Sequence, residues 1–83
     1  MKPEAFLQEF FLEKMSKKEF NKIKNVDLLS NGILDSLDIV ILSTKIKKVF
    51  NINMKINSQK TLNIFRSYND LLKFLKSNKK NEK

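Results

Sequence analysis

The first apolar positions of the chain recur at spacings of three and four residues, a pattern typical of one face of a helix. They are Leu7, Phe10, Phe11 and Met15. Pro3 suits the first turn of a helix. Acidic residues come early in this segment and lysines come late, as the helix dipole favours. The pattern predicts a first helix over residues 3–19.

The stretch that follows, residues 20–34, has no sustained period. Its apolar residues are expected to pack against the core: Val26, Leu28, Leu29, Ile33 and Leu34. The pair Asn31-Gly32 is a turn signal. Because a connection of this length exceeds the usual range, it is expected to be structured or functional.

A second helix is predicted over residues 36–50. Asp35 is a good N-cap, and Asp38 stands where the acid of a capping box belongs. At about 100° per residue, five apolar side chains form a stripe that should face the core. They are Ile39, Leu42, Ile46, Val49 and Phe50.

The opposite face of this helix is also apolar near its start, at Leu37, Val40 and Ile41. An exposed apolar patch of this kind often marks a binding surface. The alternative is a helix buried on both sides, which is hard to achieve in so small a domain.

The C-terminal third contains a loop, residues 51–60, and a short helical turn, residues 61–65. Ser67 with Asp70 three positions later is another capping signature, and it opens a last helix. The apolar residues of that helix are Tyr68, Leu71, Leu72, Phe74 and Leu75.

The predicted fold class is all-α: a small four-helix bundle of three longer helices plus one short helix, with a long loop between helices one and two. A chain of 83 residues is expected to form one domain. We assign it to residues 1–77, followed by a basic flexible C-terminal tail over residues 78–83.

Composition excludes several kinds of site. The chain has no cysteine and no histidine, which rules out disulfides, a Ser-His-Asp triad and an ordinary zinc site. Its single glycine, Gly32, cannot build a phosphate-binding glycine-rich loop. We therefore expect no enzyme activity and no metal site.

The net charge of +8 raises the possibility of an anionic partner. Sixteen of the seventeen positive residues are lysines, whereas bidentate reading of bases favours arginine. Lysine, asparagine, isoleucine and phenylalanine also share A- and T-rich codons, so genome composition is an alternative source of this charge. We expect no specific nucleic acid partner, and a small basic helical nucleic-acid-binding domain remains the competing interpretation.

No apolar stretch approaches the roughly 20 residues that span a membrane. Glu4, Glu9 and Glu13 interrupt the N-terminal apolar run, unlike the core of a signal peptide. The expectation is a cytoplasmic protein with no membrane partner.

Ser36 follows the predicted N-cap, so its side chain lies at the positive end of the helix dipole, where a phosphate is favoured. No histidine is present and no lysine stands near the start of the helix, so Ser36 cannot be a self-activated nucleophile. Serine is also common near helix starts for structural reasons alone. The functional interpretation is a hydroxyl to which another enzyme attaches a group.

The segment GILDSLDIVILSTKIKKVF, residues 32–50, resembles the phosphopantetheine attachment region of acyl carrier proteins and of related peptidyl and aminoacyl carriers. Asp35-Ser36-Leu37 matches the signature of that family. The order of the predicted helices agrees as well, and FRSYNDLLKFL, residues 65–75, resembles the closing helix.

The resemblance implies that Ser36 carries 4'-phosphopantetheine, donated by coenzyme A, as a phosphodiester, with Asp35, Leu37 and Asp38 around the attachment point. The terminal thiol of this arm would hold an acyl or aminoacyl group as a thioester. The implied partners of the monomer are a phosphopantetheinyl transferase and an acyl or aminoacyl ligase, synthase or transferase.

The chain departs from the fatty-acid carriers, whose second helix is typically acidic. Outward positions here include three lysines, so the expected role lies in a specialised biosynthetic pathway. The predicted partner-docking residues are Leu37, Val40, Ile41, Lys45, Lys47 and Lys48. Two alternatives remain: the lysines reflect composition only, or the apolar patch belongs to an interaction module whose serine is unmodified.

Cargo sheltered between the second and third helices would need a lining there. The candidates are Leu42, Ile46, Met54, Ile56, Leu62 and Phe65. Ordinary core packing explains these six residues equally well.

Overall fold

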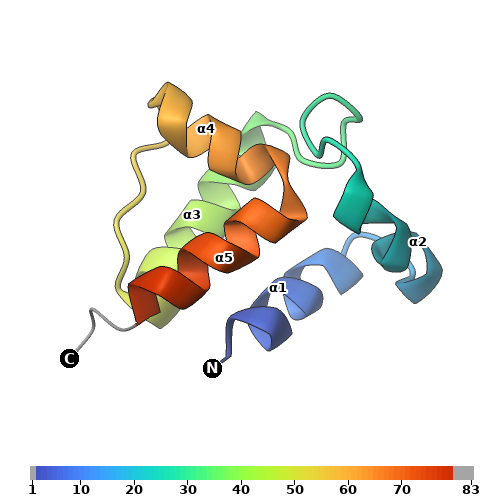
Figure 1. The fold of residues 1–83 in the computed structure, drawn as a ribbon, viewed down its shortest axis with the longest axis horizontal. Helices are drawn as coiled ribbons and strands as arrows, with labels where there is room; N and C mark the ends of the chain where they lie inside the picture. Colours follow the sequence, from blue (N-terminus) through green and yellow to red (C-terminus); the bar gives the residue numbers. More distant parts are fainter. Residues whose placement is uncertain (1, 80–83) are drawn as a thin grey trace.

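Six helical segments form within residues 2–79, the part of the chain that this computed structural model describes. They are α1 (Pro3–Leu12), α2 (Lys17–Lys22), a 3₁₀ helix η1 (Ile23–Asn25), α3 (Ser36–Phe50), α4 (Gln59–Arg66) and α5 (Tyr68–Lys79) (Figure 1). No strand occurs in these residues, which confirms the all-α class.

The first helix is shorter than predicted, because α1 ends at Leu12 rather than continuing to residue 19. A second helix starts after the N-cap Ser16, whose hydroxyl accepts a hydrogen bond from the N–H of Glu19 while the Glu19 carboxylate accepts one from the N–H of Ser16. This capping box stabilises a new helix start and turns the chain. Met15 lies in the turn and still packs, partly buried, against the core.

The long connection after α1 is structured, as predicted. It contains α2 and η1, and Leu28 and Leu34 are fully or almost fully buried. Three further apolar residues of the connection pack against the core partly buried: Val26, Leu29 and Ile33. The connection therefore forms part of the fold.

Helix α1 runs antiparallel to α3. As the residue number increases along α1 and the turn after it, the residue contacted in α3 has a lower number. The three contacts are Phe6 with Phe50, Phe10 with Lys45, and Lys14 with Asp38. The Phe6 and Phe50 rings meet edge to face with centroids 5.0 Å apart, a favourable aromatic geometry.

Helix α1 is antiparallel to α5 as well. Glu4, at the start of α1, pairs with Lys76 near the end of α5 at 2.7 Å, and Phe11 meets Tyr68 at the start of α5. Helices α3 and α5 therefore run in the same direction, while α4 crosses at one end and α2 lies to the side (Figure 1).

The buried side chains of the described residues are all apolar, apart from the hydroxyl of Tyr68. Leu7, Phe10 and Phe11 of the predicted α1 face are among them. The Cα radius of gyration is 12.0 Å, and a compact domain of this length should have about 12 Å. The helices thus enclose one core.

Helix α3 has the predicted bounds, and its C-cap, Asn51, adopts a left-handed conformation. Four residues of its predicted core stripe are buried: Ile39, Leu42, Ile46 and Phe50. The prediction for Val49 is wrong, because its side chain is 44% exposed. At about 100° per residue Val49 falls at the edge of the stripe, where the neighbouring helices no longer cover it.

The predicted turn over residues 61–65 lies inside α4, which begins at Gln59, two residues before the predicted start of that turn. Ser67 caps α5 as predicted, with its hydroxyl accepting from the N–H of Asp70 at 3.2 Å. Helix α5 continues through Lys79, so the first two residues of the predicted tail are helical. The rest of that tail, residues 80–83, lies outside the described residues.

Candidate functional site

Ser36 is the first residue of α3 and is exposed. Its hydroxyl makes no hydrogen bond within residues 2–79. The first N–H groups of a helix have no acceptor within the helix, so they give this end a partial positive charge. A free hydroxyl at this position is open to covalent modification.

A reciprocal capping box fixes the start of α3. The N–H of Asp38 donates to Oδ1 of Asp35 at 2.9 Å, and the N–H of Asp35 donates to Oδ2 of Asp38 at 3.1 Å. Both predicted capping residues therefore act as expected. The box encloses Ser36 and Leu37, which sets the direction of the Ser36 side chain.

Lys14, from the turn after α1, adds a positive charge at the start of α3. Its Nζ lies 2.9 Å from Oδ1 of Asp38, whose side chain is only 16% exposed. Burial alone would raise the pKa of Asp38, but the hydrogen bonds from Lys14 and from the N–H of Asp35 outweigh it, so the pKa lies below its ordinary value. Asp38 is thus held as a carboxylate.

The sequence argument places no lysine near the start of this helix, but in the folded chain Lys14 lies there. Lys14 precedes Asp38 by 24 residues, and only the antiparallel packing of α1 on α3 brings them together. The lysine pairs with a carboxylate, so it still offers no free base to Ser36.

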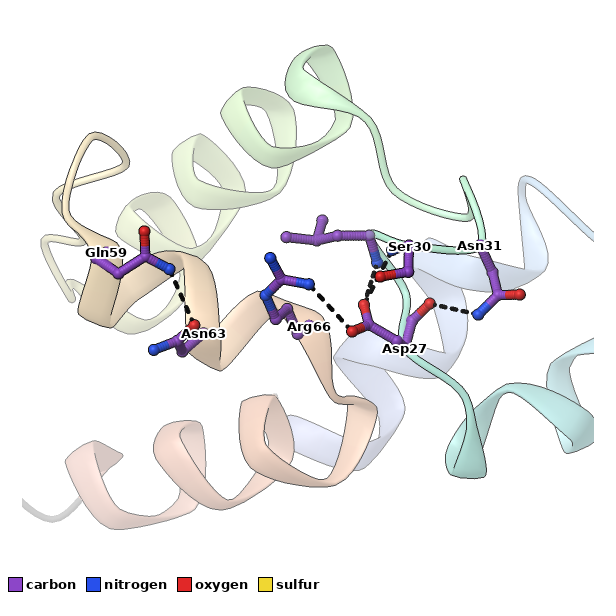
Figure 2. A network of polar contacts seen from close by, with 7 residues as sticks. Asp27, Ser30, Asn31, Gln59, Asn63 and Arg66 are labelled. Atoms are coloured by element: carbon purple, nitrogen blue, oxygen red, sulfur yellow. Dashed lines mark hydrogen bonds and ion pairs between the residues drawn. The ribbon is translucent and has the colours of Figure 1, made fainter.

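A polar network holds the loop that leads into this site (Figure 2). Asp27 accepts hydrogen bonds from the N–H groups of Leu29 and Ser30, both at 3.0 Å, and pairs with Nη1 of Arg66 at 3.0 Å. The hydrogen bond from Ser30 contributes most to lowering the pKa of Asp27, with Arg66 adding to it. The only arginine of the chain therefore anchors the loop to the end of α4.

The backbone of the loop turns sharply before α3. Leu28 O accepts from the N–H groups of both Ile33 and Leu34 at 3.0 Å, and Leu28 N–H donates to Arg66 O at 2.7 Å. Gly32 has φ of +71°, a left-handed conformation that other residues adopt only with strain. The predicted Asn31-Gly32 turn is confirmed, and it directs the chain toward Asp35.

Next to Ser36, α3 exposes Leu37, Val40 and Ile41, which we call the apolar strip. Leu37 is 67% exposed, Val40 43% and Ile41 39%. The alternative of a helix buried on both faces is therefore excluded. The strip is a continuous part of the α3 surface, because these residues are spaced by three and four positions or adjacent.

The three lysines predicted beside the strip do not act together. Lys45 turns toward α1, with Nζ 5.8 Å from the centre of the Phe10 ring. Lys47 donates to Oδ1 of Asn51 at 3.0 Å. Lys48 alone of the three has no hydrogen-bond, ion-pair or cation–π partner in the described part of the chain, and helical geometry aligns it with Ile41 and Leu37.

The six residues proposed to line a cargo pocket belong to the core. Leu42, Ile46 and Phe65 have no exposed surface. Met54, Ile56 and Leu62 pack against them partly buried. The structure instead has an open cleft of about 550 Å³ between the α1–α2 turn and the loop before α3, lined by Lys14, Met15, Glu19, Lys22, Ile23, Gly32 and Ile33.

Comparisons of the chain with protein-family models, with curated proteins and with solved structures find no match. None of the helices within residues 2–79 is both long and apolar enough to cross a membrane.

Proposed function

We propose that the chain is a carrier protein of the acyl carrier type, in which Ser36 bears 4'-phosphopantetheine. One observation carries the proposal most directly: Ser36 is an exposed hydroxyl with no hydrogen-bond partner in residues 2–79, at the first residue of a helix that begins with a reciprocal capping box, beside an exposed apolar strip. The arm would supply the thiol that a chain without cysteine lacks. The chain itself would then need only to present the arm, orient it and deliver its cargo to partner enzymes.

The surroundings of Ser36 fit a phosphodiester. A negative phosphate on the Ser36 oxygen would lie at the positive end of α3, where anions are favoured. The carboxylates of Asp35 and Asp38 would both repel it, and the ammonium of Lys14, 2.9 Å from Asp38, offsets one of these two charges. The network of Asp27 and Arg66 holds the preceding loop, so the attachment point has a defined orientation.

The helices support the four-helix bundle of a carrier. In this interpretation α1, α3, α4 and α5 are its helices, with α4 the short one. Helix α2 and η1 then elaborate the long loop between its first two helices. Among residues 2–79 no free base lies beside Ser36, so attachment of the arm would require another enzyme.

Attachment would be performed by a phosphopantetheinyl transferase with magnesium. The Ser36 oxygen forms a new bond to the phosphorus that carries the pantetheine. The bond to the outgoing phosphate breaks, 3',5'-adenosine bisphosphate leaves, and the hydroxyl proton passes to a base of the transferase.

A partner that works on the arm must approach Ser36 and would cover the apolar strip. Because Lys45 and Lys47 are engaged within the chain, Lys48 is the lysine best placed to meet an acidic group on that partner. This surface differs from the acidic helix of fatty-acid carriers, which supports a specialised acyl or aminoacyl ligase, synthase or transferase as partner.

The experiment is incubation of the chain with coenzyme A, magnesium and several broad-specificity transferases, followed by intact mass measurement. One phosphopantetheine should be added to the wild type and to Ser30→Ala, an exposed serine in the preceding loop. Ser36→Ala should gain nothing while keeping its helical circular dichroism. A wild type that no transferase modifies, or addition at another serine, would refute the proposal.

A further inference from the structure

The open cleft beside α3 combines an apolar wall with a charged rim. Met15 and Ile33, both partly buried, supply most of the apolar surface, since the third apolar lining residue, Ile23, is only 4% exposed. Lys14, Lys22 and Glu19 supply charge. Its volume of about 550 Å³ lies within the range of pockets that take small molecules. The cleft is therefore large enough for a short acyl chain.

The cleft lies close to the attachment serine. Lys14, one of its lining residues, contacts Asp38 at 2.9 Å, and Asp38 in turn binds the N–H of Asp35, the residue before Ser36. Gly32 and Ile33, on its other wall, precede Ser36 by four and three positions. A long flexible arm on Ser36 would reach the cleft by folding back over the capping box.

The rim of the cleft favours a negative charge. The carboxylate of Glu19 is engaged by the N–H of Ser16 at 3.0 Å, and the ammonium of Lys14 is engaged by Asp38. Lys22 has no ion-pair or hydrogen-bond partner among the described residues. Two further exposed lysines of α2, Lys17 and Lys18, add positive charge to the same helix.

The core between α3 and α4 offers less room. Leu42, Ile46 and Phe65 are fully buried there, so a chain entering between them would have to displace packed side chains. Binding in the open cleft requires no such rearrangement.

We propose that this cleft is the resting site of the cargo on the arm, and that it favours an acyl group ending in a carboxylate. The apolar wall would cover the methylene chain, and Lys22 would pair with the terminal carboxylate. This inference rests on the proposed carrier function, and it adds the location and the chemical class of the cargo.

The test compares two cargoes of equal chain length on the same protein. A promiscuous transferase transfers hexanoyl or adipoyl phosphopantetheine from the corresponding coenzyme A thioesters, and intact mass confirms loading. Backbone amide NMR shifts of Ile23, Gly32 and Ile33 then report on the cleft, and thioester hydrolysis reports on shielding. The variants are Lys22→Gln and, as a matched control, Lys60→Gln, an exposed lysine of α4.

The adipoyl group should shift the cleft amides more than the hexanoyl group and should hydrolyse more slowly. A preference of about two- to fivefold is expected, the range that an exposed ion pair supports. Lys22→Gln should remove the preference, and Lys60→Gln should keep it. Equal behaviour of the two cargoes, or shifts confined to Leu42, Ile46 and Leu62, would overturn the inference, whereas absence of loading would refute the carrier function itself.

Discussion

Lys14 and Asp38 show how single residues at this site depend on the packing of the whole chain. The two charges meet at 2.9 Å across 24 positions of sequence, at the start of the helix that presents Ser36. Asp38 serves three purposes at once: it caps Asp35, pairs with Lys14 and sets the charge beside the serine. Changes at Lys14 should therefore affect Ser36 without touching it.

Lys14→Gln should lower the free energy of unfolding by about 0.5–1 kcal/mol, the upper range for an incompletely buried ion pair. It should also slow modification of Ser36, because the capping box loses its neutralising charge. Lys14→Arg should retain most of both properties. Lys18→Gln, an exposed lysine in α2, is the control. Urea denaturation and transferase kinetics measure the effects, and equal behaviour of Lys14→Gln and Lys18→Gln would contradict this role.

The aspartates also predict a pH dependence. The pKa values of Asp27 and Asp38 are lowered in the folded chain, so the unfolded chain binds protons more readily. Their contribution to stability is fully present above the ordinary aspartate pKa of about 3.9 and is lost as the pH falls through the folded values. Urea denaturation from pH 7 to pH 2.5 should show this decline, and Asp38→Asn should make it shallower. An unchanged slope in Asp38→Asn would contradict the assignment.

At the scale of the element, the helices differ in how far local sequence determines them. The bounds of helix α3 and all of its core stripe except Val49 were predictable, because its N-cap, its capping acid and its apolar period all lie within the helix or next to it. The end of α1 was also marked in the sequence, by Ser16 and Glu19 three positions later. The lysines around Ser16 are equally typical of the last turn of a long helix. The charge pattern therefore led to a predicted end of α1 that lies too far along the chain.

The geometry of the candidate site could be predicted from the sequence only in part. Exposure of Leu37, Val40 and Ile41 follows from the helical period, and the structure confirms it. The pairing of Lys14 with Asp38 and the open cleft arise where distant segments pack, and no local pattern encodes them. The lysines of α3 look alike in sequence, yet Phe10 and Asn51 engage two of them.

The capping box makes a prediction for α3 as an element. Asp35→Ala should lower the free energy of unfolding by about 1 kcal/mol, because the N–H of Asp38 loses its acceptor. Asp35→Asn should cost less, since asparagine is also a good N-cap. Thermal and urea unfolding by circular dichroism measure the difference. Equal destabilisation by the two substitutions would show that charge, and not the cap, is what matters there.

At the scale of the molecule, one face of α3 carries Ser36 and the apolar strip, while the core lies on the other side of that helix. The separation allows a partner to contact Ser36 without disturbing the packed helices. Helix α3 also carries two valines of similar exposure at different distances from Ser36. Val40 is 43% exposed near Ser36, and Val49 is 44% exposed at the far end of α3.

This pair provides a matched test of docking. Val40→Asp should slow loading by the cognate enzyme about tenfold or more, since a charge desolvated without a partner in an interface costs at least about 1–3 kcal/mol. Val49→Asp adds the same charge with similar exposure farther from the serine, so it should have little effect. Both variants should keep their helical circular dichroism. Equal loss of loading in both would argue against docking on the apolar strip.

The central claim is that Ser36 carries phosphopantetheine in the cell. The most direct measurement is the intact mass of the chain produced from its own gene in its native host, with fragmentation to locate any added group. The account predicts a species heavier by one phosphopantetheine, with or without an acyl group, and fragments that assign the addition to Ser36. A chain recovered entirely unmodified, or modified only at another residue, would contradict it.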